Sequence, residues 1–481
     1  MDKGAKKMES KLFQPTWESL RKYECPEWFQ NAKFGIWAHW GAASVPMYGD
    51  WYARKMYEEG SDAYYHHWKV YGHPSKNGYK DIIPLWKAED FDPDALLAFY
   101  KKCGARYFMA LAVHHDNFDN WDSKWHKWNS VNMGPHKDII AMWKKAADKY
   151  GLKFAVSEHL GASQLWWMGN KSADKEGVYK GVPYDANNPE YWDLYQPPVE
   201  DPENPFCYSR DKKVEEDWYR RLIDLLDHYE PDMLYTDGPF PYGKSGLKLV
   251  SHLYNLKAKD GKTQAVYTQK DTRAEYEIGV LDVERSGLGS ISSRPWQTDT
   301  CLGDWFYDVK ARYKSARQVI DMLVHCVSKN GNLMLSVPLK PSGVLDDECK
   351  LILEQIGKWL EKNGEAIYES RPWKRFGEGD TLRFFSPLNE KQLSWSAQDF
   401  HFTRKKDAVY VFQMGIPVSG NTILVESLAA SEDNPVGKMK VSHVQELGTG
   451  EEICFKQTEK GLLLTMPKEW MNGYPIVYKV W

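Results

Sequence analysis

The chain has 481 residues, of which 42% are apolar and 27% are charged, and its formal net charge at pH 7 is −4. This composition is typical of a globular protein and excludes a disordered or collagen-like chain. A mildly acidic chain without a basic block is a poor candidate for nucleic-acid binding. Because no apolar stretch reaches the roughly 18 residues that cross a bilayer, we expect no membrane-spanning helix.

Aromatic residues are abundant, with 22 Trp, 29 Tyr and 18 Phe. Trp and Tyr offer flat apolar faces with a polar edge, which suits the C–H side of a pyranose ring, although composition alone favours an aromatic-rich core. The seven cysteines show no CxxC or Cys/His spacing, so we expect no structural zinc site. The first residues contain no apolar signal segment. We therefore expect a cytosolic protein, or a periplasmic or secreted one whose signal peptide is absent from this sequence.

Strand-like and helix-like segments alternate over the first 370 residues. Amphipathic helices are predicted at 92–102, 138–150, 215–229 and 345–363, the first with Asp92 as its N-cap. Apolar strands are predicted at 34–40, 106–115, 153–160, 232–237, 264–269 and 332–337. Strands that alternate with helices predict parallel β/α units, so we expect an α/β fold with a (β/α)8 TIM-like barrel over residues 1–370.

The pattern changes beyond Arg371-Pro372. Short β-rich runs separated by Gly, Pro, Asn and Asp are found at 381–385, 408–414, 422–427, 438–444, 462–466 and 476–480. They predict a C-terminal antiparallel β-sandwich domain over residues 371–481. Since no low-complexity linker separates the two parts, we expect the domains to pack directly against each other.

Polar residues stand at the ends of four of the predicted barrel strands. These strand ends carry His39-Trp40, His114-His115-Asp116, Glu158-His159 and Asp237-Gly238. In a barrel the carboxyl ends of the strands converge on the face that holds active sites. We therefore expect these side chains to lie together, rather than to be unrelated polar strand ends that meet solvent.

Two chemistries use histidines and carboxylates in such an arrangement. A metallohydrolase would take His39, His114, His115 and Asp237 as metal ligands. Neighbouring residues on a strand point to opposite sides, however, so His114 and His115 are not expected to hold one metal ion together. The second chemistry is glycoside hydrolysis by two carboxylates, with histidines that bind sugar hydroxyls, and the aromatic content favours it.

Several motifs in chain order are similar to those of one known family. They are 33–41 (KFGIWAHWG), 44–46, 51–54 (WYAR), 114–116, 129–130, 134–135, 137–138, 229–237, 295–300 (PWQTDT), 328–341 and 357–368. In combination, over about residues 15–375, they resemble the α-L-fucosidases, family 29 of the glycoside hydrolases. The predicted β-sandwich is similar in kind to the C-terminal domain of that family.

The resemblance implies a retaining exo-glycosidase that removes terminal α-L-fucosyl residues by double displacement, with no metal and no organic cofactor. It implies Asp237 as the nucleophile. This role agrees with the chemistry, because a retaining enzyme needs a carboxylate fixed on a rigid strand end. The simpler interpretation of Asp237 is a residue that caps the next helix. It implies Glu284 as the acid/base, from its distance before Trp296. Asp282 and other glutamates are the alternatives for that role.

The resemblance also implies a sugar subsite. His39, His114 and His115 are implied to bind sugar hydroxyls, which suits an imidazole because it can donate and accept hydrogen bonds. Further substrate contacts are expected from Trp37, Trp40, Asp50, Trp51, Glu158, His159, Tyr235, Lys270 and Trp305. Lys270 is preferred over Arg273 as the cation beside the nucleophile. Trp37 and Trp305 are expected around the C6 methyl group of fucose.

The chain departs from the family pattern at Asp50, where Glu is common, and at Tyr235, where Trp is common; two further departures bear on the choice of sugar. Ser157-Glu158-His159 stands where an aromatic hydroxyl is common, and Gly238 after the nucleophile is small. Room beside a polar group would admit L-galactose, which is fucose with a hydroxyl on C6, because an apolar pocket rejects an added hydroxyl only weakly. An exo-α-L-galactosidase acting on algal or plant galactans is one alternative, and an inactive sugar-binding relative is another. The expected partner is an oligosaccharide or polysaccharide with terminal α-L-fucose or α-L-galactose.

Overall fold

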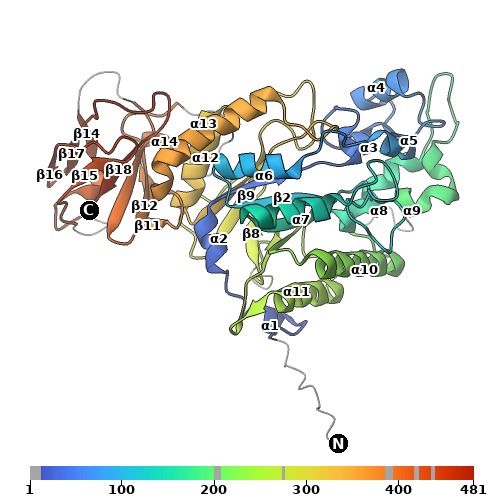
Figure 1. Ribbon diagram of the computed structural model, residues 1–481, viewed down its shortest axis with the longest axis horizontal. Helices are drawn as coiled ribbons and strands as arrows, with labels where there is room; N and C mark the ends of the chain where they lie inside the picture. The colour runs from blue at the N-terminus through green and yellow to red at the C-terminus, as the bar shows by residue number, and fades with distance from the viewer. Residues whose placement is uncertain are drawn as a thin grey trace, which may run out of the picture.

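The computed structural model describes residues 12–199, 207–273, 277–384, 390, 394–416, 422–434 and 439–481. It consists of a barrel domain with a β-rich C-terminal domain packed on one side of it, at the left of Figure 1. Within the described residues, no helix is both long enough and apolar enough to span a membrane.

Eight parallel strands close into the barrel in the spatial order β1-β10-β9-β8-β7-β4-β3-β2. Their bounds are β1 (Phe34–Ala38), β2 (Tyr107–Val113), β3 (Lys153–Glu158), β4 (Met233–Thr236), β7 (Val266–Gln269), β8 (Val280–Asp282), β9 (Trp296–Cys301) and β10 (Gly331–Ser336). The barrel closes where β1 pairs with β10, with Phe34 opposite Leu333. The predicted (β/α)8-like barrel is confirmed.

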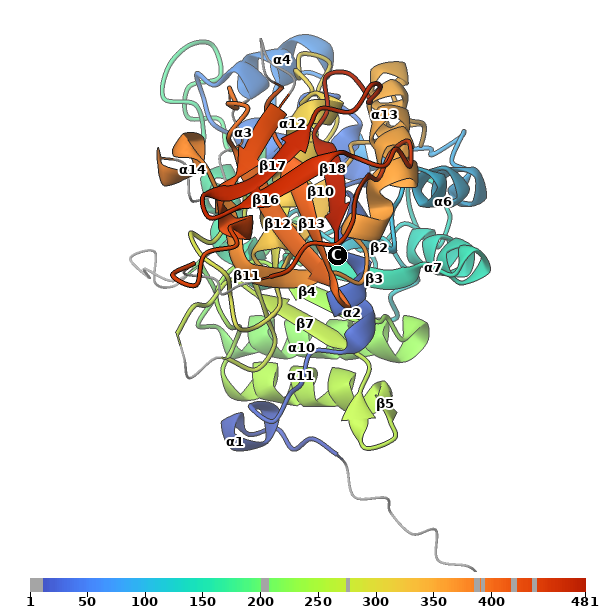
Figure 2. The same cartoon turned by 90° about the vertical axis from the view of Figure 1, so that its left-hand side faces the viewer.

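Helices pack around the outside of this barrel, as the view in Figure 2 shows for α6, α7, α10 and α11. The helices outside the two insertions described below include α2 (Glu27–Ala32), α6 (Pro93–Lys102), α7 (Ile139–Tyr150), α10 (Lys212–Tyr229), α11 (Lys244–Leu256), α12 (Ala316–Ser328) and α13 (Asp347–Asn363). The helix predicted at 92–102 begins as expected, because the Asp92 side chain accepts a hydrogen bond from the Ala95 amide. The described residues that flank β8, between β7 and β9, form turns and loops and no helix.

Two barrel strands, β8 and β9, are missing from the sequence-based prediction. β8 has only three residues, and β9 reads Trp-Gln-Thr-Asp-Thr-Cys, which lacks the apolar pattern of a buried strand. All of β9 is nevertheless buried, and the polar side chains of Gln297, Thr298, Asp299 and Thr300 all have hydrogen-bond partners. Gln297 accepts a hydrogen bond from the Tyr107 hydroxyl (2.8 Å) and donates one to the Asp282 carboxylate (2.7 Å).

Insertions surround the carboxyl ends of the strands. Between β1 and β2 lie η1 (Ala42–Ser44), α3 (Tyr52–Lys55), α4 (Asp62–Val70), α5 (Tyr79–Ile82) and η2 (Ile83–Leu85). After β3 lie η3 (Leu160–Ala162), α8 (Ser163–Trp166), η4 (Trp167–Lys171), η5 (Asp185–Asn187), η6 (Pro189–Tyr191) and α9 (Trp192–Tyr195). Figure 1 shows α3, α4, α5, α8 and α9 grouped at the end far from the C-terminal domain. The two insertions are joined by the Tyr57 hydroxyl, which donates to Asp185 (2.8 Å).

The C-terminal domain holds two antiparallel sheets, of order β11-β12-β13-β18-β15 and β14-β17-β16. Their strands are β11 (Arg371–Glu378), β12 (Phe400–Lys405), β13 (Ala408–Gln413), β14 (Thr422–Val425), β15 (Val444–Glu446), β16 (Phe455–Thr458), β17 (Gly461–Thr465) and β18 (Ile476–Val480). One apolar cluster, which includes Phe402, Val411 and Leu464, is formed by residues from both sheets. The predicted β-sandwich is therefore confirmed.

The strand predicted at 381–385 is wrong, because Asp380–Phe384 forms the short helix α14, and residue 385 lies outside the described residues. The Asp399 carboxylate accepts hydrogen bonds from the amide and hydroxyl of Thr381, which fixes the first turn of that helix. The remaining short elements are α1 (Trp17–Leu20), β5 (Ala258–Lys259), β6 (Lys262–Thr263), η8 (Gly364–Ala366) and η9 (Glu426–Leu428).

The two domains share direct contacts. The Trp359 indole of α13 donates a hydrogen bond to the Pro475 carbonyl (3.1 Å). Glu365 of the barrel domain accepts hydrogen bonds from Tyr410 (2.6 Å) and Lys479 (2.7 Å) of the C-terminal domain. The expectation of domains that pack without a linker agrees with these contacts.

Candidate active site

A cavity of about 150 Å³ opens at the carboxyl ends of the barrel strands. It is lined by Trp37, His39, Asp50, Trp51, His114, His115, His159, Tyr235, Asp237, Lys270, Glu284, Asp299 and Trp305. Five of these residues are the first to follow a barrel strand: His39, His114, His159, Asp237 and Lys270 follow β1, β2, β3, β4 and β7. The barrel thus gathers the polar strand ends on one face, as its topology requires.

Asp237 lies at the centre of the polar contacts. Its amide donates to the Glu158 carbonyl (3.1 Å) and its carbonyl accepts from the Tyr208 hydroxyl (2.7 Å), so the backbone beneath the carboxylate is fixed. Its Oδ1 lies 2.6 Å from Lys270 Nζ. Burial alone would raise the pKa of Asp237, but the histidines and the Lys270 cation outweigh burial and hold this pKa well below its usual range.

Lys270 joins two carboxylates. Its Nζ lies 2.6 Å from Asp237 Oδ1 and also 2.6 Å from Glu284 Oε2. Burial disfavours the charge, but Asp237, Asp299 and Glu284 raise the pKa of Lys270, so the ammonium group is retained. Because both oxygens bind the same nitrogen, they lie within about 5 Å of each other, the separation of paired carboxylates in retaining glycosidases.

Glu284 owes its position to β8 and β9. It follows β8 by two residues, and the pairing with β9 continues past the strand, since the Val283 amide donates to the Gln297 carbonyl (2.9 Å). The Arg285 amide donates to the Asp299 carbonyl (2.8 Å). The side chain of Glu284 is 40% exposed, so a substrate can reach it.

Asp282, the alternative to Glu284, is placed differently. It is buried beneath the cavity and is not among the residues that line it. Burial, followed by repulsion from Asp299, raises the pKa of Asp282 well above its usual range, so the two carboxyls cannot both be ionised. Asp299 itself lines the cavity and accepts a hydrogen bond from the Tyr235 hydroxyl (3.0 Å). Sequence reasoning missed Asp299, although the run of four polar residues in WQTDTC was the signal that a wall of the barrel is polar.

Four histidines line the cavity and are buried. Burial lowers the pKa of His39, His114 and His159, so these rings are neutral near pH 7 and each offers one donor and one acceptor nitrogen. His39 is held by Ser336 Oγ, 3.0 Å from Nδ1. His115 Nδ1 lies 2.9 Å from the His159 carbonyl.

The argument that His114 and His115 must point to opposite sides is wrong. It assumed that both residues belong to a strand, whereas β2 ends at Val113. Past the strand end, both rings reach the same cavity, and their ring centroids are 4.7 Å apart. One nitrogen each of His114, His115 and His159 can be chosen so that all lie within 4.8 Å of one another, a spacing that a metal ion could bridge.

Aromatic side chains and one acid complete the wall. The Trp37 ring centroid lies 4.8 Å from that of Tyr235 and 5.8 Å from that of Trp305. Trp51 is 38% exposed and has a left-handed backbone (φ 62°), which presents its indole at the rim. Burial and the neighbouring Asp304 raise the pKa of Asp50 to about 8, so this carboxyl is mostly protonated at neutral pH.

Some predicted substrate contacts lie outside the cavity lining. The Trp40 indole donates to the Lys340 carbonyl (2.9 Å) and packs in the core. Glu158 accepts hydrogen bonds from the Leu160 amide (2.9 Å) and the Trp218 indole (3.3 Å), and burial raises its pKa to about 7. Both side chains pack away from the cavity. Glu158 directly precedes His159 and Trp40 directly follows His39, and neighbouring residues at a strand end can point in different directions.

Arg273, the other candidate cation, forms an ion pair with Asp271 (2.6 Å) and does not line the cavity. Ser157 and Gly238 do not line the cavity either. They therefore do not provide the expected room for the C6 hydroxyl of L-galactose. A Cβ at Gly238 would lie 2.9 Å from the Tyr208 hydroxyl, which explains why a small residue stands there.

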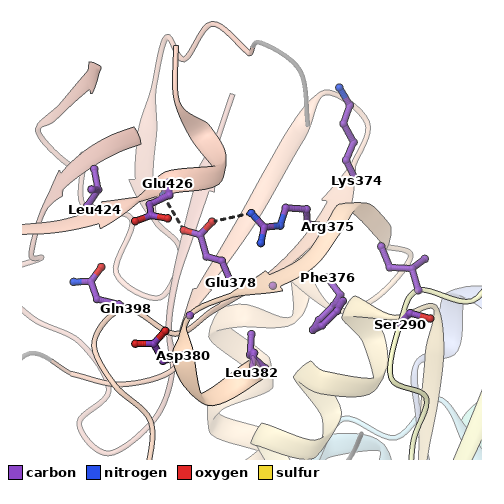
Figure 3. A pocket seen from close by; sticks show the side chains of 13 residues that line it. Ser290, Lys374, Arg375, Phe376, Glu378, Asp380, Leu382, Gln398, Leu424 and Glu426 are labelled. Carbon is purple, nitrogen blue, oxygen red and sulfur yellow. Dashed lines mark hydrogen bonds and ion pairs between the residues drawn. The ribbon is translucent and has the colours of Figure 1, made fainter. Parts of the chain in front are cut away.

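A second hollow, of about 790 Å³, lies where β11 meets the loop around Ser290 (Figure 3). Its central carboxylate, Glu378, accepts hydrogen bonds from the amides of Glu426 and Ser427 (2.8 Å each). Arg375 approaches Glu378 to 3.9 Å. The acid is therefore occupied in holding the C-terminal domain together, and the cavity at the strand ends remains the candidate active site.

The family model described as "Alpha-L-fucosidase" matches residues 2–365. The chain belongs to the α-L-fucosidase family. It is 27% identical to tissue alpha-L-fucosidase of Rattus norvegicus, over 96% of this chain and 90% of that one. It is 25% identical to plasma alpha-L-fucosidase of Homo sapiens, with 96% and 90% covered.

The solved structures of this family agree in fold. The structure of Thermotoga maritima alpha-fucosidase in complex with a mechanism based inhibitor has a TM-score of 0.77 and 26% identity, and the match covers 97% of this chain and 99% of that chain. Alpha-L-fucosidase isoenzyme 1 from Paenibacillus thiaminolyticus, at 19% identity and a TM-score of 0.69, covers 96% and 99% and shares the fold. The chain is thus an α-L-fucosidase-family glycoside hydrolase with a TIM barrel and a C-terminal β-sandwich.

Proposed function

We propose that this chain is a retaining exo-α-L-fucosidase with Asp237 as nucleophile and Glu284 as acid/base. One observation carries the proposal: Lys270 bridges the two carboxylates at 2.6 Å from each. An inverting enzyme needs room for a water molecule between the sugar and the base, and this spacing is too short to provide it. The small cavity suits one terminal sugar unit.

In the first step the Asp237 carboxylate attacks the anomeric carbon and forms a glycosyl ester. The bond from that carbon to the leaving oxygen breaks, and Glu284 donates its proton to this oxygen. In the second step the Glu284 carboxylate takes a proton from a water molecule that attacks the same carbon. The ester bond breaks, Asp237 leaves as a carboxylate, and the sugar keeps its anomeric configuration.

The neighbouring groups prepare this chemistry. Lys270 keeps Asp237 ionised, and the fixed backbone of Asp237 holds the carboxylate in place. The neutral rings of His39, His114 and His159 can donate to or accept from the sugar hydroxyls. The Trp37 and Trp305 rings offer an apolar surface for the C6 methyl group.

The nucleophile is tested by Asp237→Ala, which we expect to abolish hydrolysis of 4-nitrophenyl α-L-fucoside because no ester can form. Azide, which can attack from the vacated side, should restore some activity and yield the β-glycosyl azide. Asp227→Ala is the matched control, since this exposed aspartate lies on α10 and pairs with His252. Near-normal turnover by Asp237→Ala would falsify the assignment.

A second candidate, exo-α-L-galactosidase, is favoured by Asp299. This buried carboxyl lines the cavity together with Trp37 and Trp305, where a purely apolar wall would best suit the fucose methyl. A carboxyl there can bind the C6 hydroxyl that distinguishes L-galactose. We expect Asp299→Ala to reduce kcat/KM for the α-L-galactoside more than for the α-L-fucoside if L-galactose is the natural sugar. Equal losses on both sugars would leave fucose as the preferred assignment.

A further inference from the structure

The nucleophile shares its oxygen with two imidazole nitrogens. Asp237 Oδ2 lies 3.3 Å from His115 Nε2 and 3.2 Å from His159 Nδ1. A third ring, that of His114, has a nitrogen within 4.8 Å of nitrogens of the other two. All three histidines are more than nine-tenths buried. The cluster combines three imidazoles and one carboxylate around one small space.

The hydrogen bonds determine which His115 nitrogen carries a proton. His115 Nδ1 lies 2.9 Å from the His159 carbonyl, which can only accept, so in the neutral ring Nδ1 carries the hydrogen. His115 Nε2 then turns its lone pair toward Asp237 Oδ2, which also carries lone pairs. Two acceptors 3.3 Å apart repel each other unless a proton or a cation lies between them.

His159 offers a further acceptor. If Nδ1 donates to Asp237, then Nε2 carries the lone pair, and within the described residues this buried nitrogen has no hydrogen-bond partner. A metal ion resolves the conflict in another way: when the hydrogen of His159 is on Nε2, Nδ1 can give its lone pair to the ion together with His115 Nε2 and Asp237 Oδ2. The arrangement therefore favours a cation that prefers nitrogen and carboxylate ligands.

The distances agree with tetrahedral zinc. Bonds of about 2.0–2.1 Å place neighbouring ligand atoms of a tetrahedron about 3.3–3.4 Å apart. The two measured edges, from Asp237 Oδ2 to His115 Nε2 and to His159 Nδ1, are 3.3 Å and 3.2 Å. His114 is in reach as a further ligand after a small ring movement.

We propose that His115, His159 and Asp237, assisted by His114, form an inhibitory site for a divalent transition-metal ion, with Zn²⁺ as the reference ion. The bound ion occupies the nucleophile, so it blocks glycoside hydrolysis and competes with the substrate. Lys270 holds the other oxygen of Asp237 and its charge opposes the ion, which makes the site weaker than one built for zinc. The metal is not a cofactor here, and a chelator should raise or preserve the activity.

Calorimetric titration of ZnCl₂ into the tag-free, EDTA-treated full chain at pH 7 tests the binding without any substrate. We expect one site per chain. Co²⁺ in place of Zn²⁺ should give the strong visible absorption of a tetrahedral ion, which added Zn²⁺ removes. Steady-state assays should show Zn²⁺ inhibition that is competitive with 4-nitrophenyl α-L-fucoside and reversed by EDTA.

His159→Asn is the deciding variant. Asparagine keeps an N–H near the position of Nδ1, so the hydrogen bond to Asp237 can persist, but the imidazole lone pairs are lost. We expect zinc affinity to fall by about tenfold or more, because the variant removes one imidazole ligand of the metal ion. His252→Asn is the control, because His252 and Asp227 form a histidine–carboxylate pair on the outer helices (2.6 Å), and this variant should keep both zinc affinity and activity.

Three outcomes would overturn the inference: wild-type protein that binds no zinc, a cobalt spectrum typical of octahedral coordination, or His159→Asn with wild-type zinc affinity. Because calorimetry and the cobalt spectrum need no sugar, they remain informative even if neither fucoside nor galactoside is cleaved. Loss of activity on chelation with recovery on added zinc would also overturn the inference, since the metal would then assist catalysis.

Discussion

At the scale of single residues, the site depends on how Lys270 divides its contacts. One ammonium group stabilises the Asp237 carboxylate and also holds Glu284 close to it. In the proposed mechanism Glu284 must carry a proton when the substrate enters, because it serves as the acid. The roles proposed for the two carboxylates differ because Asp237 is the less exposed of the two, at 22% against 40% for Glu284, and is held on the end of a barrel strand.

We expect Glu284→Ala to separate the substrates by their leaving groups. Hydrolysis of 2,4-dinitrophenyl α-L-fucoside should change little in its first step, because this aglycone leaves without a proton. A fucosyl-oligosaccharide should lose about 10²–10⁴-fold in kcat/KM, the usual contribution of a positioned acid. Equal losses on both substrates would instead indicate a structural role and turn attention to other glutamates. Glu277→Ala, at the exposed Arg294 ion pair, is the control.

Lys270→Met should shift the acidic limb of the pH profile. The proposed mechanism needs ionised Asp237, and in the wild type the Lys270 cation helps to keep the pKa of Asp237 well below its usual range. Loss of the cation raises this pKa, so kcat/KM should begin to fall at a higher pH than in the wild type. Lys270→Arg retains the charge and should keep the limb nearer its original pH. An unshifted limb in Lys270→Met would contradict the role assigned to the cation.

At the scale of elements, helix α10 fixes the segment that follows β2. Arg221 is fully buried and binds Asp119 in a bidentate ion pair, while it also donates to Asn117 (2.7 Å). These partners follow His114 and His115 by only a few residues, so the helix determines where the two histidines can lie. Burial nevertheless raises the pKa of Asp119 to about 7. The buried ion pair is therefore stable only while Arg221 stays in hydrogen-bond contact with Asp119.

Arg221→Met should lower the free energy of unfolding by about 3–5 kcal/mol, because Asp119 is left buried without its counter-charge. The neighbouring Arg220→Met is the matched control. Arg220 is 49% exposed and pairs with Asp217, so its loss should cost no more than about 1 kcal/mol. Urea unfolding followed by tryptophan fluorescence measures both. Similar losses for the two variants would mean that the buried pair adds no stability.

At the scale of the whole molecule, the C-terminal domain reaches the loop that carries Glu284. Glu390 forms an ion pair with Arg285 (2.8 Å), accepts a hydrogen bond from the Thr300 hydroxyl and lies 3.5 Å from Lys314. Arg285 directly follows Glu284 in sequence and has a left-handed backbone (φ 49°). The second domain therefore helps to hold the backbone from which Glu284, the proposed acid, projects.

Glu390→Gln should weaken that support. We expect kcat/KM to fall by about tenfold for an oligosaccharide substrate and little for the dinitrophenyl sugar, because a misplaced acid affects only leaving groups that need a proton. Glu365→Gln removes a similar contact between the domains, to Tyr410 and Lys479, far from the Glu284 loop, and is the control. Equal effects of the two variants on both substrates would point to general loosening of the domains.

The order of the elements and the polar strand ends could be predicted from the sequence alone. Apolar strands such as 34–40 and capped helices such as 92–102 carry local signals, because one buried face and one cap decide their form. His39, His159 and Asp237 could be expected on one face because every parallel barrel strand ends on the same side.

Only the tertiary structure decided the rest. β8 and β9 are strands because their backbones pair with neighbouring barrel strands, and partners from other strands satisfy their polar side chains, which no local pattern records. His114 and His115 share a cavity because β2 stops at Val113, and the exact end of a strand depends on its neighbours. Trp40 and Glu158 turn away from the cavity although they adjoin residues that line it. A strand end brings a residue to the right face of a barrel, but packing against the helices and insertions determines which side chains enter the site.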